Sequence, residues 1–298
     1  MAMTGTKPAR ALLPVFSLLL AASLWGVIWY PLRILQSHGL DGLWAALVSY
    51  SAAALPGLVM LWRGRGQLVR RPFGLLALAV AAGWCNVSFI LAILDGTVVR
   101  VLLLFYLSPV WASLMGWIVL REPLSRRAVV VLTLAMGGVL FMSWHPELRH
   151  PWPREPGDWL AISSGFSFAL ANVLVRRLSD VGIPVKTAVT WVGVAGVAGV
   201  WLLAVGAAAP LAAGAGPWLG AAALGWFGIV LMTVSVQYGV THMPVQRSAV
   251  ILLFELVVGA VSSQLLTREV VTSREWLGGL LIMAAAYFAA RVQERHPE

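Results

Sequence analysis

Residues 106–127 read YLSPVWASLMGWIVLREPLSRR: an apolar helical run, an Arg-Glu pair, a short turn and the start of a second run. The same order of features recurs at an offset of 147 residues, in 254–283, FELVVGAVSSQLLTREVVTSREWLGGLLIM. One register that holds across two helices and a loop indicates an internal duplication. The paired residues are Arg100 with Arg247, Leu107 with Phe254, Arg121 with Arg268, Glu122 with Glu269, and Arg127 with Arg274.

The composition around these stretches is that of a membrane protein. Of the 298 residues, 60% are hydrophobic and 11% charged, and the mean hydropathy is +0.85. A soluble domain has about a quarter charged residues. The net charge of +9 does not indicate nucleic-acid binding, because the basic residues form short clusters between apolar runs.

A transmembrane helix needs about 20 mostly apolar residues, and ten segments of the chain qualify. We therefore expect an all-α polytopic protein whose ten transmembrane helices form two repeats of five, residues 1–144 and 158–298, joined by a polar loop, 145–157. The N-terminus lacks a small-residue cleavage site and is taken as an uncleaved first span. The expected spans are 11–35, 42–62, 72–94, 97–120, 127–143, 158–178, 186–206, 217–240, 246–266 and 274–291.

Because each repeat has an odd number of spans, we expect the two repeats to lie in the bilayer in opposite orientations, an arrangement that permits alternating access around a site at their interface. Placing both termini in the cytoplasm leaves six of the 21 basic residues outside and 15 inside, in agreement with the positive-inside rule. The expected location is the plasma membrane, which is the inner membrane in a Gram-negative bacterium. The six outside residues are Arg33, Arg100, Arg149, Arg154, Arg268 and Arg274.

Three stretches resemble the EamA-type repeats of the drug/metabolite transporter superfamily: SLWGVIWYPLRIL at 23–35, and the two quoted above. The resemblance implies a secondary transporter that exports small amphipathic metabolites. Tyr106, Leu107 and Pro109 are similar to the corresponding stretch of YddG-type exporters of aromatic amino acids, which favours amino acids as substrates. The second half departs from the pattern, with Glu255 and Leu256 where the first half has Ser108 and Pro109.

Glu255 is the acidic residue that lies well inside an expected span. A carboxylate there costs on the order of a few kcal/mol unless it is protonated, hydrated or paired, so a functional role is the default hypothesis. It could bind a substrate amine or carry a coupling proton. The structural alternative is a buried acid that bonds to neighbouring helices. By contrast, Glu122 stands beside Arg121 and is expected to form a local ion pair or mark a helix boundary.

Other polar and aromatic residues are candidates to line a cavity for substrate. Each has a structural alternative: a hydroxyl or amide also joins helices by interhelical hydrogen bonds, and a Trp also packs in a core. Pro109 adds a freed backbone carbonyl within its span. The candidates besides Glu255 are Trp25, Trp29, Asn86, Tyr106, Ser108, Trp111, Ser163, Ser167, Asn172, Gln237 and Tyr238.

A channel is the first alternative function and an intramembrane enzyme the second. The enzyme is disfavoured because the chain has no Gly-x-Ser-x-Gly, no His-Glu-x-x-His and no pair of intramembrane Asp residues. The absence of a Walker motif excludes direct coupling to ATP, and the single cysteine, Cys85, excludes an intrachain disulfide and a thiolate metal cluster. We expect no catalytic residues, no cofactor and no metal. A monomer is the expected state, with other oligomers left open.

Overall fold

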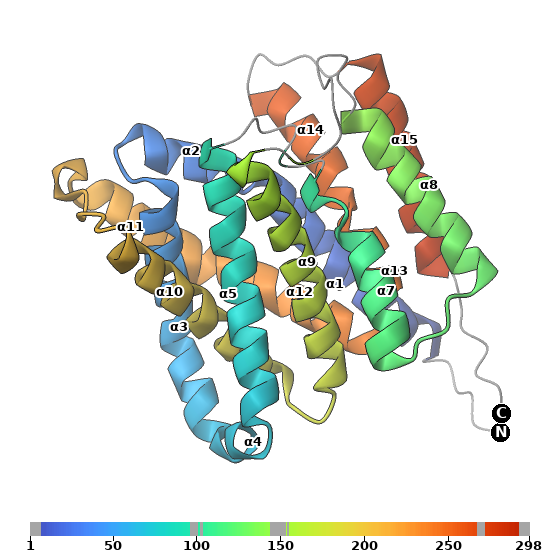
Figure 1. Ribbon diagram of the computed structural model, residues 1–298, viewed down its shortest axis with the longest axis horizontal. Helices are drawn as coiled ribbons and strands as arrows, with labels where there is room; N and C mark the ends of the chain where they lie inside the picture. The colour runs from blue at the N-terminus through green and yellow to red at the C-terminus, as the bar shows by residue number, and fades with distance from the viewer. Residues whose placement is uncertain are drawn as a thin grey trace.

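The computed structural model describes residues 7–95, 101, 104–143, 153, 155–266 and 272–291. Every regular element within these ranges is helical (Figure 1). The elements are α1 (Lys7–Val27), α2 (Trp29–Ser37), α3 (Gly42–Arg63), α4 (Arg65–Arg70), α5 (Pro72–Asp95), α7 (Ser108–Leu120), α8 (Arg126–Ser143), α9 (Pro156–Arg177), α10 (Ile183–Ala204), η1 (Leu211–Ala213), α11 (Ala215–Ala223), the π-helical η2 (Leu224–Ile229), α12 (Val230–His242), α13 (Val245–Leu252), α14 (Phe254–Leu266) and α15 (Ser273–Arg291).

Seven helical stretches of the described chain are long and apolar enough to cross a membrane. Two shorter apolar helices accompany them, Ser108–Leu120 and Trp276–Ala289. The expected all-α membrane protein is thereby confirmed, whereas the count of ten spans stays a prediction. The expected span 97–120 and the loop 145–157 lie partly outside the described residues. The seven stretches are Leu12–Ser37, Gly42–Arg63, Pro72–Ala92, Pro156–Arg177, Ile183–Ala204, Ala215–His242 and Val245–Leu266.

The outer surface of the bundle is apolar, as a lipid-facing surface must be. Phe73 is 85% exposed, Leu203 is 83% exposed and Leu265 is 77% exposed. Soluble proteins rarely expose contiguous apolar surface on this scale, since each such side chain would face water. In a bilayer the same side chains face hydrocarbon at no cost, so the exposed apolar residues support a membrane location.

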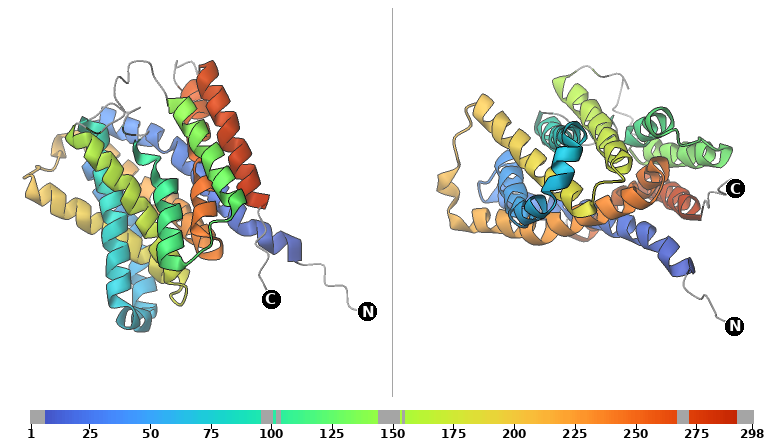
Figure 2. Two further views of the ribbon diagram at one scale, coloured as in Figure 1. Left: turned by 45° about the vertical axis from the view of Figure 1, so that its right-hand side comes forward. Right: turned by 90° about the horizontal axis from the view of Figure 1, so that it is seen from below.

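The closest helix packing joins the N-terminal to the C-terminal half. Helix α5 packs on α9 and α10, α3 packs on α10, and α1 packs on α12 and α14. Helices α8 and α15 pack on each other at one edge of the molecule and contact α13 (Figures 1 and 2). The two halves therefore share one core and are not two independent bodies.

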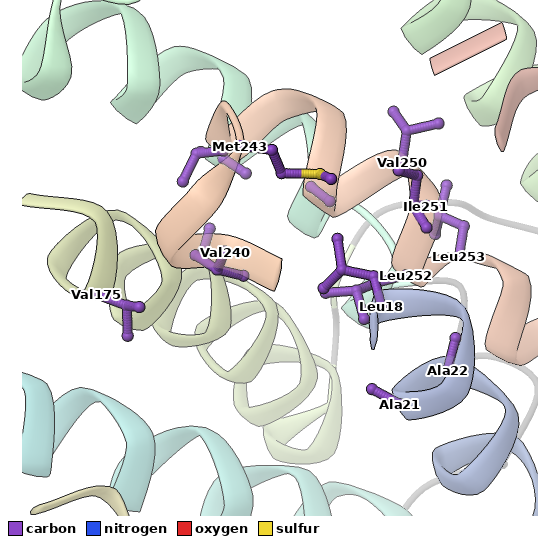
Figure 3. Close-up of a cluster of buried hydrophobic side chains, with 14 of the residues drawn as sticks. Leu18, Ala21, Ala22, Val175, Val240, Met243, Val250, Ile251, Leu252 and Leu253 are labelled. Atoms are coloured by element: carbon purple, nitrogen blue, oxygen red, sulfur yellow. The ribbon is translucent and has the colours of Figure 1, made fainter. Parts of the chain in front are cut away.

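The centre of that core lies where α1 crosses α12 and α13 (Figure 3). Leu18 of α1 is fully buried and meets Gly239 of α12, where a larger side chain would overlap it. Ile251 and Leu252 of α13 close the same cluster from the other side. One amino-terminal helix is thus held by two carboxy-terminal ones.

The first expected span, 11–35, is one helical stretch with an interruption at Ile28, between α1 and α2. Pro31 explains the interruption, because it has no N–H to donate to the carbonyl of Val27, the last residue of α1. The sequence prediction of a continuous helix missed this feature.

One end of the bundle, called the α4 end below, holds α4 and the connections α7–α8 and α9–α10 (lower edge of Figure 1). The first described turn of α1 and the last of α15 also lie toward this end (Figure 2).

Candidate functional site

Two helical stretches are interrupted at positions that the sequence repeat relates. Residues 104 and 105 are helical, residues 106 and 107 form a turn, and α7 follows; the second stretch breaks at Leu253, between α13 and α14. Tyr106 and Leu253 are 147 residues apart, the offset found in the sequence. Interrupted helices within a membrane are tolerated where they line a cavity or are covered by protein, and in transporters they form binding sites.

Proline accounts for the first of these interruptions. Pro109 has no N–H, so the carbonyl of Phe105 is left without its helical donor. That carbonyl lies against α9 at Gly165, where a Cβ would come within 2.5 Å of the oxygen. The break between α13 and α14 contains neither Pro nor Gly, and no residue there explains it locally.

Glu255 and Tyr106 meet between the two interruptions. The Tyr106 hydroxyl is the hydrogen-bond donor to the Glu255 carboxylate. Glu255 lies in the first turn of α14, where the helix dipole favours a negative charge. The close packing of α1 supports this arrangement, since a Cβ at Gly26 would lie 2.7 Å from the Glu255 carbonyl oxygen. Trp25 precedes Gly26 and is half-buried against the core.

The polar side chains of α5 and α9 mostly join helices to one another. The Tyr50 hydroxyl donates to Asn86 Oδ1 at 2.9 Å, and Trp84 Nε1 donates to Ser163 Oγ at 3.2 Å. The Ser164 hydroxyl donates to the Cys85 carbonyl at 2.7 Å. Asn86 and Ser163, expected as cavity-lining candidates, thus have the helix-joining contacts that were their structural alternative.

Three further candidates differ in how well their polar atoms are satisfied. Trp29 Nε1 donates to Ser262 Oγ at 3.0 Å and so ties α2 to α14. Trp111 Nε1 is buried and has no partner in the described part of the chain, although its ring lies edge-on to Phe166. Gln237 donates from Nε2 to Thr190 Oγ1 at 3.1 Å, while its buried Oε1 has no partner among the described residues.

The remaining candidates lie on α7, α9 and α12. Ser108 lies one residue past the interruption and is buried. Ser167 and Asn172 are buried on α9. Tyr238 lies near the α4 end of α12, with its ring against His242, at a centroid distance of 4.2 Å.

Three charged residues at the α4 end were not among the sequence candidates. Glu122 forms an ion pair with Arg176, and Lys186 is fully buried beside them. The sequence analysis counted Arg176 and Lys186 as topological signals only. One signal was available: the chain has two lysines, Lys7 and Lys186, among its 21 basic residues. Within the described residues no group of three His, Cys, Asp or Glu could hold a metal ion.

Comparison with known proteins adds a family and a fold. A family model described as EamA-like transporter family matches residues 12–144 and again residues 155–291. No curated protein sequence matches the chain. A solved crystal structure, described only as that of a protein, aligns with a TM-score of 0.71 over 94% of this chain and 96% of that one. Its sequence is 17% identical, so the likeness concerns the fold alone.

Proposed function

The chain belongs to the EamA-like transporter family, and on that premise we propose that it exports small amphipathic metabolites, amino acids first among them, by alternating access. The family consists of membrane transporters of small molecules, which makes the chain a transporter and not an enzyme. The proposed site of transport is the plasma membrane, the inner membrane in a Gram-negative cell, with both termini in the cytoplasm.

The observation that carries the proposal is the meeting of Tyr106 and Glu255 at two repeat-related helix interruptions. A hydrogen-bonded carboxylate within the membrane is costly and marks a substrate or proton pathway. Its location between two broken helices from opposite halves is where carriers with inverted repeats bind their substrates.

The proposed architecture has ten spans in two inverted repeats of five. Two separate ranges match the family model, 12–144 and 155–291, and each contains one of the interrupted stretches. The first described turn of α1 and the last described turn of α15 lie toward the same end of the bundle (Figure 2). This placement agrees with an even number of spans.

The chemistry near Glu255 favours a substrate with an amine and an apolar body. The carboxylate can accept hydrogen bonds from an ammonium group. The ring of Phe105 lies 5.4 Å from the ring of Tyr106, centroid to centroid, and 4.9 Å and 5.7 Å from the rings of Phe89 and Phe168. Such a surface suits an apolar or aromatic side chain, so aromatic amino acids are the first substrates to test.

The test is a substrate screen by counterflow in proteoliposomes, with and without an imposed pH gradient. We expect saturable exchange of one or more amino acids, and acceleration by the pH gradient if Glu255 carries a proton. Flux of sugar phosphates or nucleotide sugars without any amino-acid flux would contradict the proposed substrate. Conductive flux without counterflow would instead identify a channel.

A further inference from the structure

The connection after α7 directs the Glu122 side chain toward the second half of the chain. Helix α7 ends at Leu120, and Arg121 adopts a left-handed conformation with φ of 56°, which residues other than Gly rarely adopt. The Glu122 N–H donates back to the Gly116 carbonyl at 3.1 Å. A disfavoured backbone conformation persists where surrounding contacts hold it, and here it directs one carboxylate.

Two hydrogen bonds join the Glu122 carboxylate to described residues of the other half. Oε1 accepts from Arg176 Nε at 3.3 Å, and Oε2 accepts from the Val245 backbone N–H at 3.0 Å. Val245 is the first residue of α13, where the positive end of the helix dipole meets the carboxylate. Beside this pair, Gln246 Nε2 donates to the Pro123 carbonyl at 3.3 Å.

The two cations beside Glu122, which are Arg176 and Lys186, donate hydrogen bonds to the C-terminal ends of other helices. Arg176 Nη1 donates to the Thr241 carbonyl at 2.7 Å, in the last turn of α12. Lys186 Nζ donates to the Val175 carbonyl at 2.9 Å and to Thr241 Oγ1 at 2.8 Å. Cations favour helix C-termini, so this part of the network is stable within the second half. Glu122 attaches it to the first half.

Buried apolar side chains lie next to these polar contacts, toward the interior of the bundle. Val175 and Met243 are each 3% exposed, and Val240 is fully buried (Figure 3). Val175 precedes Arg176 in the sequence, and Val240 precedes Thr241. The polar contacts and the apolar contacts therefore hold the same helix ends together.

We propose that Glu122 is the gate residue of the α4 end: its hydrogen bonds to Arg176 and Val245 close this end and break each time it opens. The proposal rests on the proposed function, since an alternating-access carrier must open each end once in every cycle. The Arg176–Thr241 and Lys186–Thr241 hydrogen bonds join second-half helices to one another and remain intact during that motion.

The first test measures access to the interior from the α4 end and needs no substrate. Ala249→Cys, in a Cys85→Ala background, is the reporter, because Ala249 is 4% exposed and lies one turn beyond Val245 on α13. A membrane-impermeant thiol reagent is applied to vesicles from this side. We expect Glu122→Gln and Arg176→Gln each to raise the rate of labelling about 10-fold, as loss of a charge-assisted hydrogen bond shifts a two-state equilibrium.

The chain offers a matched control in an exposed ion pair at the same end. Arg71 Nε donates to Asp180 at 2.9 Å, but these side chains are 56% and 48% exposed, against 32% and 13% for Arg176 and Glu122. The hydrogen bond from Arg71 lowers the pKa of Asp180, so this pair is charged at neutral pH. Asp180→Asn should leave labelling unchanged, because exposed pairs contribute little.

Unchanged labelling in both Glu122→Gln and Arg176→Gln, with monodisperse protein, would overturn the proposal. If these variants fail to fold, Glu122→Asp decides it, because the shorter carboxylate keeps its charge but cannot reach Arg176 and Val245 together: raised labelling supports the gate, and unchanged labelling contradicts it. If no substrate shows counterflow, the proposed function is contradicted. The labelling experiment still tests the gate, because it needs no substrate. Transport at the wild-type rate in all of these variants would instead contradict the role of Glu122 as a gate.

Discussion

Glu255 and Ser108 occupy equivalent positions in the repeat, and they differ by one carboxylate that the fold does not require. The carboxylate has Tyr106 as its hydrogen-bond donor. Glu255→Gln keeps the size and the hydrogen-bonding capacity of the side chain but removes charge and titration. We expect it to reduce transport by about 10-fold or more, the effect of losing a charged hydrogen bond to substrate, without preventing folding. Counterflow rates of the purified variant across a range of pH provide the measurement.

Tyr106→Phe is the companion variant to Glu255→Gln. It removes the hydroxyl while leaving the carboxylate, so a smaller loss than that of Glu255→Gln is expected if Tyr106 only orients the acid. Wild-type transport by monodisperse Glu255→Gln at every pH would exclude Glu255 as proton carrier and as required counter-charge. The neutral candidates, beginning with Gln237 and Trp111, would then be the groups to test.

Between helices, Gly165 permits the close approach of α9 to the interrupted stretch before α7. Gly165→Ala would bring a Cβ within 2.5 Å of the Phe105 carbonyl oxygen, so one of the two backbones must move. Overpacking of this kind costs about 1–3 kcal/mol, and we expect a lower thermal unfolding midpoint in detergent. Gly196→Ala on α10 is the control, because no atom lies within 4 Å of its Cβ. Equal midpoints for the two variants would show that the contact is not close in solution.

Helix positions followed from local sequence, because their signals are local. The expected span 42–62 corresponds to α3, whose start is fixed by Asp41: its carboxylate accepts from the backbone N–H groups of Leu43 and Trp44. The interruptions did not follow. Pro56 lies inside α3 without breaking it, whereas Pro31 and Pro109 each follow a break. Which proline interrupts a helix depends on whether neighbouring helices support the freed carbonyl, and that is tertiary information.

For the candidate site, too, the sequence showed the residues with a local signal but not the partners that are distant in sequence. Glu255 could be found because an acidic residue in an apolar run is conspicuous at any distance from its partners. The partner of Glu122 could not, since Arg176 is 54 positions away and Arg121 is adjacent. For Asn86 and Ser163 the two alternatives could not be separated, because the sequence identifies a polar side chain in a helix without saying whether another helix satisfies it.

Across the whole molecule, the two repeats differ in what they contribute at the α4 end. At Glu122 the first half supplies the carboxylate, and the second half supplies the cation, Arg176, and the start of α13 that it bonds. The repeat-related acid, Glu269, lies outside the described residues.

The proposed inverted arrangement predicts that corresponding loops of the two halves face opposite sides of the membrane. Gly66 follows the second expected span of the first half, and Ala212 follows the second expected span of the second half. A Cβ at Gly66 meets no atom within 4 Å, and Ala212 is exposed, so cysteine fits at both positions. In a Cys85→Ala background, we expect an impermeant maleimide to label Gly66→Cys only from the cytoplasm and Ala212→Cys only from outside. Labelling of both from one side would mean that the halves are parallel, and rocking about an inverted repeat would no longer be available as the transport mechanism.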